Sequence, residues 1–328
     1  MENLRIAVVG ATGMVGRVML QVLEEQGFSN SELIAVASSN GRKVQFAGRE
    51  LGTITADKAL KLKPQISIFS AGSSVSTKYA PEFAKFGFVI DNSSAWRMFD
   101  HIPLVVPEIN ATDINENTRI IANPNCSTIQ MVLALWPLET KYGIDRIVVS
   151  TYQSVTGSGM KGLQQLLDER AGADTSRFYP HPIDLNLLPH GGDFLENGYT
   201  SEEMKLVNET RKILHNQDIA ITATVVRVPV KGGHSESVNI SLKKEFEINE
   251  IISLLSKTQG IVVLDKPDAN VYPMPLFAEG RDEVFVGRIR RDFSQPNGLN
   301  MWVVADNLRK GAATNAVQIA QYLIKRYF

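Results

Sequence analysis

Cysteine is almost absent from this sequence, with Cys126 the single thiol among 328 residues. One cysteine allows no disulfide within the chain and no cysteine-based metal site, which fits a reducing compartment. The chain also lacks an excess of either charge, because 34 Lys and Arg stand against 35 Asp and Glu. This balance argues against nucleic acid or a charged membrane surface as a partner.

Long hydrophobic runs are missing as well. No stretch of about 18 apolar residues occurs, and the apolar run at residues 4–9 is too short for a signal peptide. We therefore expect a cytoplasmic protein. At roughly 100 to 200 residues per domain, the chain length predicts two domains.

The first 120 residues alternate short apolar runs with helical patterns. The run at 4–9 leads through a glycine-rich turn into a helical pattern that ends at Gly27. We predict further buried strands in five apolar runs, at residues 32–38, 66–72, 88–93, 103–109 and 119–125. Buried strands separated by helices or long loops predict a parallel, doubly wound α/β sheet.

The pattern changes after Cys126. Longer segments that often alternate apolar and polar residues follow at 145–155, 219–230, 235–244, 283–293 and 300–308. They predict an antiparallel sheet, with helices at 160–170, 201–215 and 247–257 over one face. A last helix, within 309–328, carries an apolar stripe of Ala316, Ile319, Ala320 and Leu323. The loop at 172–200 is long enough to predict a functional or interface role.

Gly10, Gly13 and Gly16 lie between the first strand and the first helix. Thr12 stands where the second glycine of the usual G-x-G-x-x-G dinucleotide pattern would be. The context still favours a dinucleotide, because glycines permit close backbone approach and a helix N-terminus binds pyrophosphate. The alternative is a glycine-rich turn in a flavodoxin-like fold that binds no dinucleotide.

The end of the second strand bears on the choice of nicotinamide cofactor. NAD enzymes usually place Asp or Glu there to bind the ribose 2′-hydroxyl, whereas this chain has Ser38, Ser39 and Asn40, followed by Arg42 and Lys43. Hydroxyls and cations suit a 2′-phosphate, so the sequence favours NADP. Arg42 and Lys43 could equally form a solvated charged turn.

Cys126 lies between the strand that ends near Asn123 and an apolar helix that begins just past Ser127. At a helix N-terminus, the dipole and the free N–H groups favour a thiolate, and the same groups can hold an oxyanion. This position favours a nucleophile over the other common role of a lone cysteine, a small buried hydrophobe.

A thiolate that handles acyl groups usually needs a proton carrier. The five histidines are His101, His181, His190, His215 and His234. His234 is the best candidate, because two glycines precede it, a strand follows it and Arg227 lies on the preceding strand; sequence spacing alone cannot pair it with Cys126. Arg97 and Lys205 are candidate anion ligands, although each could be an ordinary surface charge.

The combination of motifs resembles aspartate-semialdehyde dehydrogenase over essentially the whole chain. The motifs are GATGMVG, NPNCST, TYQSVTG, SEEMK, RVPVKGGHSES and RKGAATNAVQIA. The resemblance implies a Rossmann-like domain formed by residues 1–126 with 309–328, and a central α+β catalytic and dimerisation domain at 127–308. It implies a cytoplasmic homodimer that uses NADP to interconvert 4-aspartyl phosphate with L-aspartate 4-semialdehyde and phosphate. That step leads to lysine, through diaminopimelate, and to methionine and threonine.

The resemblance also implies roles for individual residues. Cys126 would form an acyl thioester, His234 would be the acid/base, and Gln153 would orient the substrate. Arg227 would bind the α-carboxylate and Glu202 the α-ammonium group, while Arg97 and Lys205 would hold phosphate. The implied cofactor site consists of Gly10, Ala11, Thr12, Gly13, Met14, Val15, Ser38, Ser39, Arg42, Thr156, Gly157 and Asn315. No metal is implied.

Two alternatives stay open at this point. N-acetyl-glutamyl-phosphate reductase has a similar layout, but its acetylated substrate has no ammonium group for Glu202 to bind. A non-catalytic nucleotide-binding relative would be expected to lack the thiol, whereas Cys126, Gln153, Arg227 and His234 are all present here.

Overall fold

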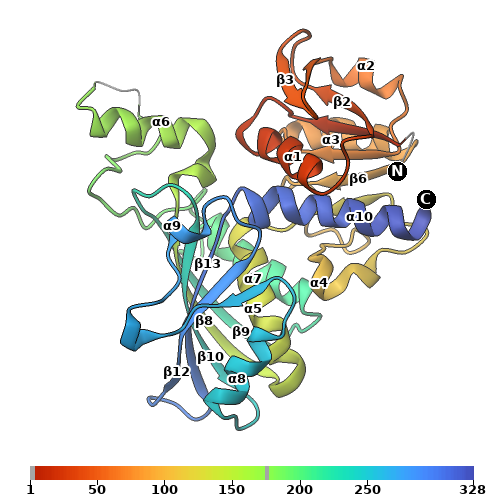
Figure 1. Cartoon of the computed structure of the whole chain (residues 1–328). Coiled ribbons are helices and arrows are strands. Elements are labelled where there is room, and N and C mark those ends of the chain that lie inside the picture. The colour runs from red at the N-terminus through yellow and green to blue at the C-terminus, as the bar shows by residue number, and fades with distance from the viewer. Residues whose placement is uncertain (1–3, 174–176) are drawn as a thin grey trace. The chain divides into compact units, whose positions relative to one another are not determined.

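The computed structural model describes residues 4–173 and 177–328 (Figure 1). The chain divides into two compact units. Met1–Asn125 and Ala312–Phe328 form unit 1, and Cys126–Gly311 forms unit 2. In the described part of the chain, no helix is both long and apolar enough to cross a membrane.

Unit 1 is built on a parallel sheet of five strands in the order β2-β1-β5-β6-β7. The strands are β1 (Arg5–Val9), β2 (Glu32–Val36), β5 (Ile66–Phe69), β6 (Phe88–Asp91) and β7 (Ile120–Ala122). β5 and β6 are buried throughout, because both faces of the sheet are covered. The predicted doubly wound sheet is therefore confirmed.

Helices cover both faces of this sheet. They are α1 (Met14–Glu25), α2 (Ala56–Leu60), α3 (Ser73–Ala84), α4 (Pro107–Asn110) and α10 (Asn315–Tyr327). Ile6 and Val8 of β1 pack in a core with α1 and α10, whereas Ala7 and Val9 pack in a second core with α2 and α3. The predicted stripe of α10 is buried completely and completes the first core.

Two local features of unit 1 differ from expectation. Residues 103–109 form no strand, because Leu104 makes a single bridge to Ala122 and Pro107 begins α4. A proline has no N–H to donate to a neighbouring strand, so Pro107 prevents the apolar run from continuing as a strand. The hairpin of β3 (Lys43–Phe46) and β4 (Arg49–Gly52) was not predicted.

Unit 2 contains a six-stranded sheet in the order β11-β12-β13-β10-β8-β9. The strands are β8 (Ile144–Gln153), β9 (Ala220–Arg227), β10 (His234–Leu242), β11 (Ile261–Val263), β12 (Val284–Asp292) and β13 (Gly298–Ala305). The expected antiparallel sheet is wrong in part. The sheet is mixed, because β8 pairs in parallel with β9 and β11 pairs in parallel with β12. Alternating burial identifies a half-buried strand but does not fix its direction.

The helices of unit 2 play different parts. α5 (Cys126–Tyr142), α7 (Ser201–Ile213) and α8 (Ile248–Ser256) pack against the sheet. The helix predicted at 160–170 is present as α6 (Gly159–Arg170), but it lies away from the sheet (Figure 1). Leu166 of α6 packs instead with Tyr179, Ile183 and Leu188 of the long loop, of which residues 174–176 lie outside the described chain. The short elements of unit 2 are η2 (Val155–Ser158), η3 (Pro267–Ala269) and α9 (Pro275–Ala278), while η1 (Ala111–Asp113) belongs to unit 1 and the π-helix η4 (Arg309–Thr314) begins in unit 2 and ends in unit 1.

Candidate active site and nucleotide pocket

The glycine-rich turn of unit 1 depends on close backbone contacts. Gly10 has a φ of +94°, and a Cβ there would lie 2.4 Å from the carbonyl oxygen of Ser70. A Cβ on Gly16 would lie 2.1 Å from the carbonyl oxygen of Gly10. Only glycine fits at either position, so the turn holds the N-terminus of α1 directly against the end of β1.

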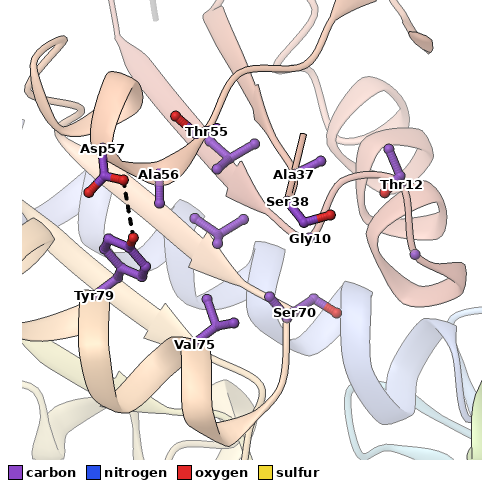
Figure 2. A pocket seen from close by; sticks show the side chains of 14 residues that line it. Gly10, Thr12, Ala37, Ser38, Thr55, Ala56, Asp57, Ser70, Val75 and Tyr79 are labelled. Carbon is purple, nitrogen blue, oxygen red and sulfur yellow. Dashed lines mark hydrogen bonds between the residues drawn. The ribbon is translucent and has the colours of Figure 1, made fainter. Parts of the chain in front are cut away.

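A cavity of about 600 Å³ opens beside this turn. Its lining comes from the ends of β1, β2 and β5 and from the starts of α2 and α3, where ligands of parallel sheets usually bind. Figure 2 shows Gly10, Thr12 and Ser38 on one side, with Asp57 and Tyr79 facing each other away from Thr12. The Tyr79 hydroxyl donates a hydrogen bond to Asp57 Oδ2 at 3.3 Å.

The predicted cofactor residues are distributed unevenly. Gly10, Thr12, Gly13 and Ser38 line the cavity, whereas Ala11, Met14, Val15, Ser39, Arg42 and Asn315 are outside its described lining. The buried Asn315 amide donates to the Val105 carbonyl at 2.9 Å and to Asn123 Oδ1 at 2.6 Å, and so ties segments of unit 1 together. Thr156 and Gly157 belong to unit 2.

Cys126 is the first residue of α5 and is partly buried. This placement at a helix N-terminus agrees with the prediction from sequence. A Cβ on Gly311 would lie 2.8 Å from Cys126 Cβ, so the glycine leaves room for the thiol-bearing residue. Beside it, Gln153 Nε2 donates to Ser127 Oγ at 3.0 Å, and the pair connects the end of β8 to the start of α5.

His234 begins β10 and has no exposed surface. Its Nδ1 accepts a hydrogen bond from the backbone N–H of Ser154 at 3.0 Å, while Nε2 is buried without a hydrogen-bond partner in the described chain. Burial, with a further contribution from the charge of Arg227, lowers the pKa of His234 well below its ordinary value. The imidazole is therefore neutral at physiological pH, and its proton is on Nε2.

Arg227 and Glu202 form an ion pair beside this imidazole. Arg227 Nη2 lies 3.5 Å from Glu202 Oε2, and Nη1 donates to the Ser154 carbonyl at 3.1 Å. A Cβ on Gly157 would approach both Arg227 Nη1, at 2.9 Å, and His234 Nε2, at 3.0 Å. Gly157 thus leaves open a space that is bordered by a cation and an imidazole.

The two candidate phosphate ligands lie in different units. Lys205 is partly exposed on α7, three residues after Glu202 and on the same helical face. Arg97 belongs to unit 1, is 7% exposed, and donates from Nη2 to the Asn92 carbonyl at 2.9 Å.

The structure adds partners that sequence reasoning missed. Ser127 pairs with Gln153, and the backbone of Ser154 contacts both His234 and Arg227. Asp57 and Tyr79 were also missed, although Asp57 is a carboxylate in the nucleotide-sized cavity. Ser127 could have been found from the sequence, because it directly follows the cysteine. The backbone N–H of Ser154 could not, because a sequence pattern does not show which backbone group a side chain will contact.

Together these groups can support acyl transfer. Unit 2 offers a thiol at a helix N-terminus, an Nε2–H donor and an adjacent pair of opposite charges. Such a pair complements a substrate that carries both a carboxylate and an ammonium group. Unit 1 offers a glycine turn beside a cavity of suitable size for part of a dinucleotide.

Comparison with known families agrees with this division. Residues 5–117 match the model for the NAD binding domain of semialdehyde dehydrogenase. Residues 135–310 match the model for the dimerisation domain of semialdehyde dehydrogenase.

Individual relatives cover nearly the whole chain. An aspartate-semialdehyde dehydrogenase of Aquifex aeolicus is 52% identical over 98% of both chains, and one of Bacillus subtilis is 46% identical over 99% of this chain and 98% of that protein. A crystal structure of aspartate semialdehyde dehydrogenase II from Vibrio cholerae, complexed with ASA, superposes with a TM-score of 0.95 at 42% identity over both full chains. This chain belongs to the aspartate-semialdehyde dehydrogenase family of oxidoreductases.

Proposed function

We propose that the protein catalyses the reversible, NADP-dependent reductive dephosphorylation of 4-aspartyl phosphate to L-aspartate 4-semialdehyde. The observation that carries the substrate assignment is the Arg227–Glu202 pair at 3.5 Å, beside the buried Nε2 of His234. An amino acid backbone brings one carboxylate and one ammonium group, which are the two charges that this pair can bind. Arg227 suits the carboxylate because its guanidinium can donate two parallel hydrogen bonds.

The chemistry begins at Cys126. Its thiolate attacks the carbonyl carbon of the acyl phosphate, the C–O bond to phosphate breaks, and phosphate leaves with the bonding electrons. The product is a thioester on Cys126. The N–H groups at the start of α5 are suited to hold the oxyanion that develops during this attack.

Reduction and release complete the cycle. NADPH, when bound, would supply the hydride that reduces the thioester carbonyl to a thiohemiacetal oxyanion. The Nε2–H of the neutral His234 donates a hydrogen bond to this oxygen and stabilises the negative charge that develops there. Collapse of this oxyanion re-forms the C=O bond and breaks the C–S bond, which releases the aldehyde and regenerates the Cys126 thiolate.

The remaining proposed roles concern substrate orientation, phosphate and the nicotinamide. Gln153, fixed by Ser127, orients the carbonyl next to the thiol. Arg97 and Lys205 are the proposed phosphate ligands. Thr156, buried at the η2 turn, donates to Asn307 Oδ1 at 3.0 Å, and with Gly157 it is proposed to border the nicotinamide.

The proposed cofactor is NADP. The glycine turn fits a pyrophosphate, because backbone rather than side chains faces the space at Gly10 and Gly13. We propose that Ser38, Ser39 and Arg42 bind the 2′-phosphate, with Ala11, Thr12, Met14, Val15 and Asn315 also in the cofactor site. Of the three residues proposed to bind the 2′-phosphate, Ser38 lines the cavity.

The test is a kinetic assay with two cofactors and two acyl phosphates. We expect rapid NADPH oxidation with 4-aspartyl phosphate, slower oxidation of NADH, and no turnover of N-acetyl-glutamyl phosphate. Preference for the acetylated substrate would overturn the substrate assignment. Equal rates with NADH would overturn the cofactor assignment alone.

We also propose a homodimer in the cytoplasm that serves lysine, methionine and threonine biosynthesis. Exposed apolar side chains on α6 and the following loop support a dimer surface there. They are Met160, Leu167, Phe178, Leu185, Leu187 and Phe194. Monodisperse particles of monomer mass in light scattering at micromolar concentration would contradict the dimer.

A further inference from the structure

Glu236 is an acidic residue in the interior of the six-stranded sheet of unit 2. It lies on β10, where His234, Glu236, Val238, Ile240 and Leu242 are all buried, whereas Ser237, Asn239 and Ser241 are not. Alternate residues of a strand share a face, so Glu236 occupies a core position between His234 and Val238. Burying a carboxylate at such a position is costly unless it is paired.

Glu236 has unusual polar neighbours. Thr151 of β8 lies directly opposite Glu236 in the antiparallel register. The Gln130 side chain of α5 is near enough to the Glu236 carboxyl group to lower its pKa. Both Glu236 oxygens, Gln130 Oε1 and Thr151 Oγ1 are buried with no hydrogen bond to the described residues. Polar atoms that share a small region and lack partners call for a specific explanation.

A protonated carboxyl group supplies the missing donor. A carboxylate only accepts hydrogen bonds, whereas a carboxylic acid also donates one. The Glu236 O–H can donate to Gln130 Oε1, and the Thr151 hydroxyl can donate to the other Glu236 oxygen. Opposed side chains on antiparallel strands, with Cβ atoms about 5 Å apart, are within reach of such a bond.

The electrostatic surroundings agree with an uncharged Glu236. Burial raises its pKa well above the ordinary value, and the Gln130 amide offsets only part of this rise. The adjacent β13 has no titratable side chain. The titratable groups on the other elements packed against Glu236 are Cys126, Glu139, Lys141 and Tyr142 of α5, Asp145, Arg146 and Tyr152 of β8, and His234 of its own strand.

Gln130 links this carboxyl to the active site. It follows Cys126 by four residues on α5, so the two side chains share a helical face. Its Nε2 donates to the backbone carbonyl of His234 at 3.3 Å. One amide therefore connects the helix that carries the thiol to the strand that carries the imidazole.

We propose that Glu236 is a positioning residue whose uncharged carboxyl orients the Gln130 amide, which in turn fixes the backbone of His234 against α5. This inference rests on the proposed function of His234. It assigns Glu236 no contact with substrate or cofactor. Its effect on the reaction comes through the placement of the imidazole.

Infrared spectroscopy tests the protonation state without any assay of activity. We expect the C=O stretching band of a protonated carboxylic acid in the wild-type protein at neutral pH, in the region separate from carboxylate bands. Glu236→Gln should remove this band. A wild-type protein without the band, or a band that persists in Glu236→Gln, would overturn the proposal.

Kinetics test the positioning role. Glu236→Leu should lower kcat about 10- to 100-fold with little change in KM, because small displacements of catalytic groups cost rates of this order. Glu236→Gln should restore most of kcat, since an amide keeps a donor and an acceptor. Val238→Ala, on the same face of β10, is the control for lost stability and should leave kcat near wild type.

Gln130→Met provides a second route that leaves Glu236 in place. It should lower kcat as Glu236→Leu does, and the double variant should lose little more than either single one. Wild-type kcat in Gln130→Met or in a folded Glu236→Leu would overturn the positioning role. Failure of the proposed function is distinct, because the wild-type protein would then lack semialdehyde dehydrogenase activity while the infrared result still stood.

Discussion

The backbone N–H of Ser154 donates to Nδ1 of His234 at 3.0 Å. This bond requires a lone pair on Nδ1, so the neutral imidazole carries its proton on Nε2, the nitrogen without a protein partner in the described chain. Protonation of Nδ1 would place its N–H directly opposite the backbone N–H of Ser154, so two donors would face each other. The same contact thus selects the tautomer and disfavours the imidazolium.

The depressed pKa of His234 predicts how stability changes with pH. Burial first, and Arg227 second, lower the folded-state pKa below the unfolded value of 6.5. At and below pH 6.5 the unfolded chain therefore binds more protons, so the free energy of unfolding falls as pH falls from 6.5 towards the folded-state pKa. We expect the His234 contribution to lower the urea midpoint from pH 7 to pH 5, since each tenfold difference in proton affinity between the two states corresponds to about 1.4 kcal/mol. The raised pKa of Glu236 acts in the opposite direction, so the His234 contribution is measured as the difference between wild type and His234→Gln.

His234→Gln should remove the His234 contribution, because glutamine does not titrate, so its urea midpoint should fall less than that of wild type, or rise, between pH 7 and pH 5. His181→Gln is the matched control, since His181 is exposed on the long loop, and it should retain the wild-type dependence. Parallel pH curves for wild type and His234→Gln would contradict the depressed pKa.

Cys126→Ala should abolish turnover and spare nucleotide binding. The thiol is the proposed nucleophile, so loss of its sulfur removes the thioester route, whereas the glycine turn and its cavity belong to unit 1. Loss of NADPH oxidation, with an unchanged Kd from nucleotide fluorescence titration, is the expected result. Residual turnover close to wild type would refute the nucleophile.

Much of the fold could be predicted because burial leaves a direct trace in sequence. β1, β5 and β6 are short apolar runs, and they pair as a parallel sheet. The β3–β4 hairpin has no comparable trace, since its strands have four residues each and β4 is largely exposed. The direction of β9 beside β8 depends on the long segment between them, which strand periodicity does not describe.

The candidate site could be proposed by residue type but not by contact. Cys126 and His234 were chosen as candidates because a lone thiol and a histidine after two glycines are uncommon patterns. The partner of His234 Nδ1 lies 80 positions away and is a backbone group, so no side-chain pattern could reveal it. Glu236 looked like one polar residue in a half-polar strand until the register placed it opposite Thr151.

Asp57 provides a test of cofactor choice at the nucleotide cavity. Its carboxylate lines the cavity that also contains Ser38, and it accepts a hydrogen bond from Tyr79. A negative charge there disfavours a 2′-phosphate, and the side chain is exposed, so solvent screens the effect. Asp57→Asn should tighten NADP about two- to fivefold and leave NAD nearly unchanged, in line with the size of exposed charge effects.

Titration of both nucleotides against wild type and Asp57→Asn measures this difference directly. Asp57→Asn keeps the size of the side chain and can still accept the bond from Tyr79. Equal changes for NADP and NAD would mean that Asp57 does not face the 2′ position.

Gly157→Ala should damage catalysis through a single added methyl group. The new Cβ would lie 2.9 Å from Arg227 Nη1, closer than real Cβ contacts come, and 3.0 Å from His234 Nε2, tighter than most of them. Arg227 forms a hydrogen bond with Ser154 and an ion pair with Glu202, and His234 forms a hydrogen bond with Ser154. Moving either side chain away from the new methyl group would therefore break one of these interactions. We expect kcat/KM for the semialdehyde to fall about 100-fold, the order of cost of a displacement of about 1 Å.

Gly52→Ala is the control for Gly157→Ala, because Gly52 has no neighbouring atom within 4 Å of an added Cβ and its φ is not positive. It should keep wild-type kinetics. A thermal midpoint for Gly157→Ala close to wild type, together with the loss of kcat/KM, would place the effect at the His234–Arg227 site rather than in the fold. Wild-type kcat/KM in Gly157→Ala would mean that the space between these side chains is not where the substrate reacts.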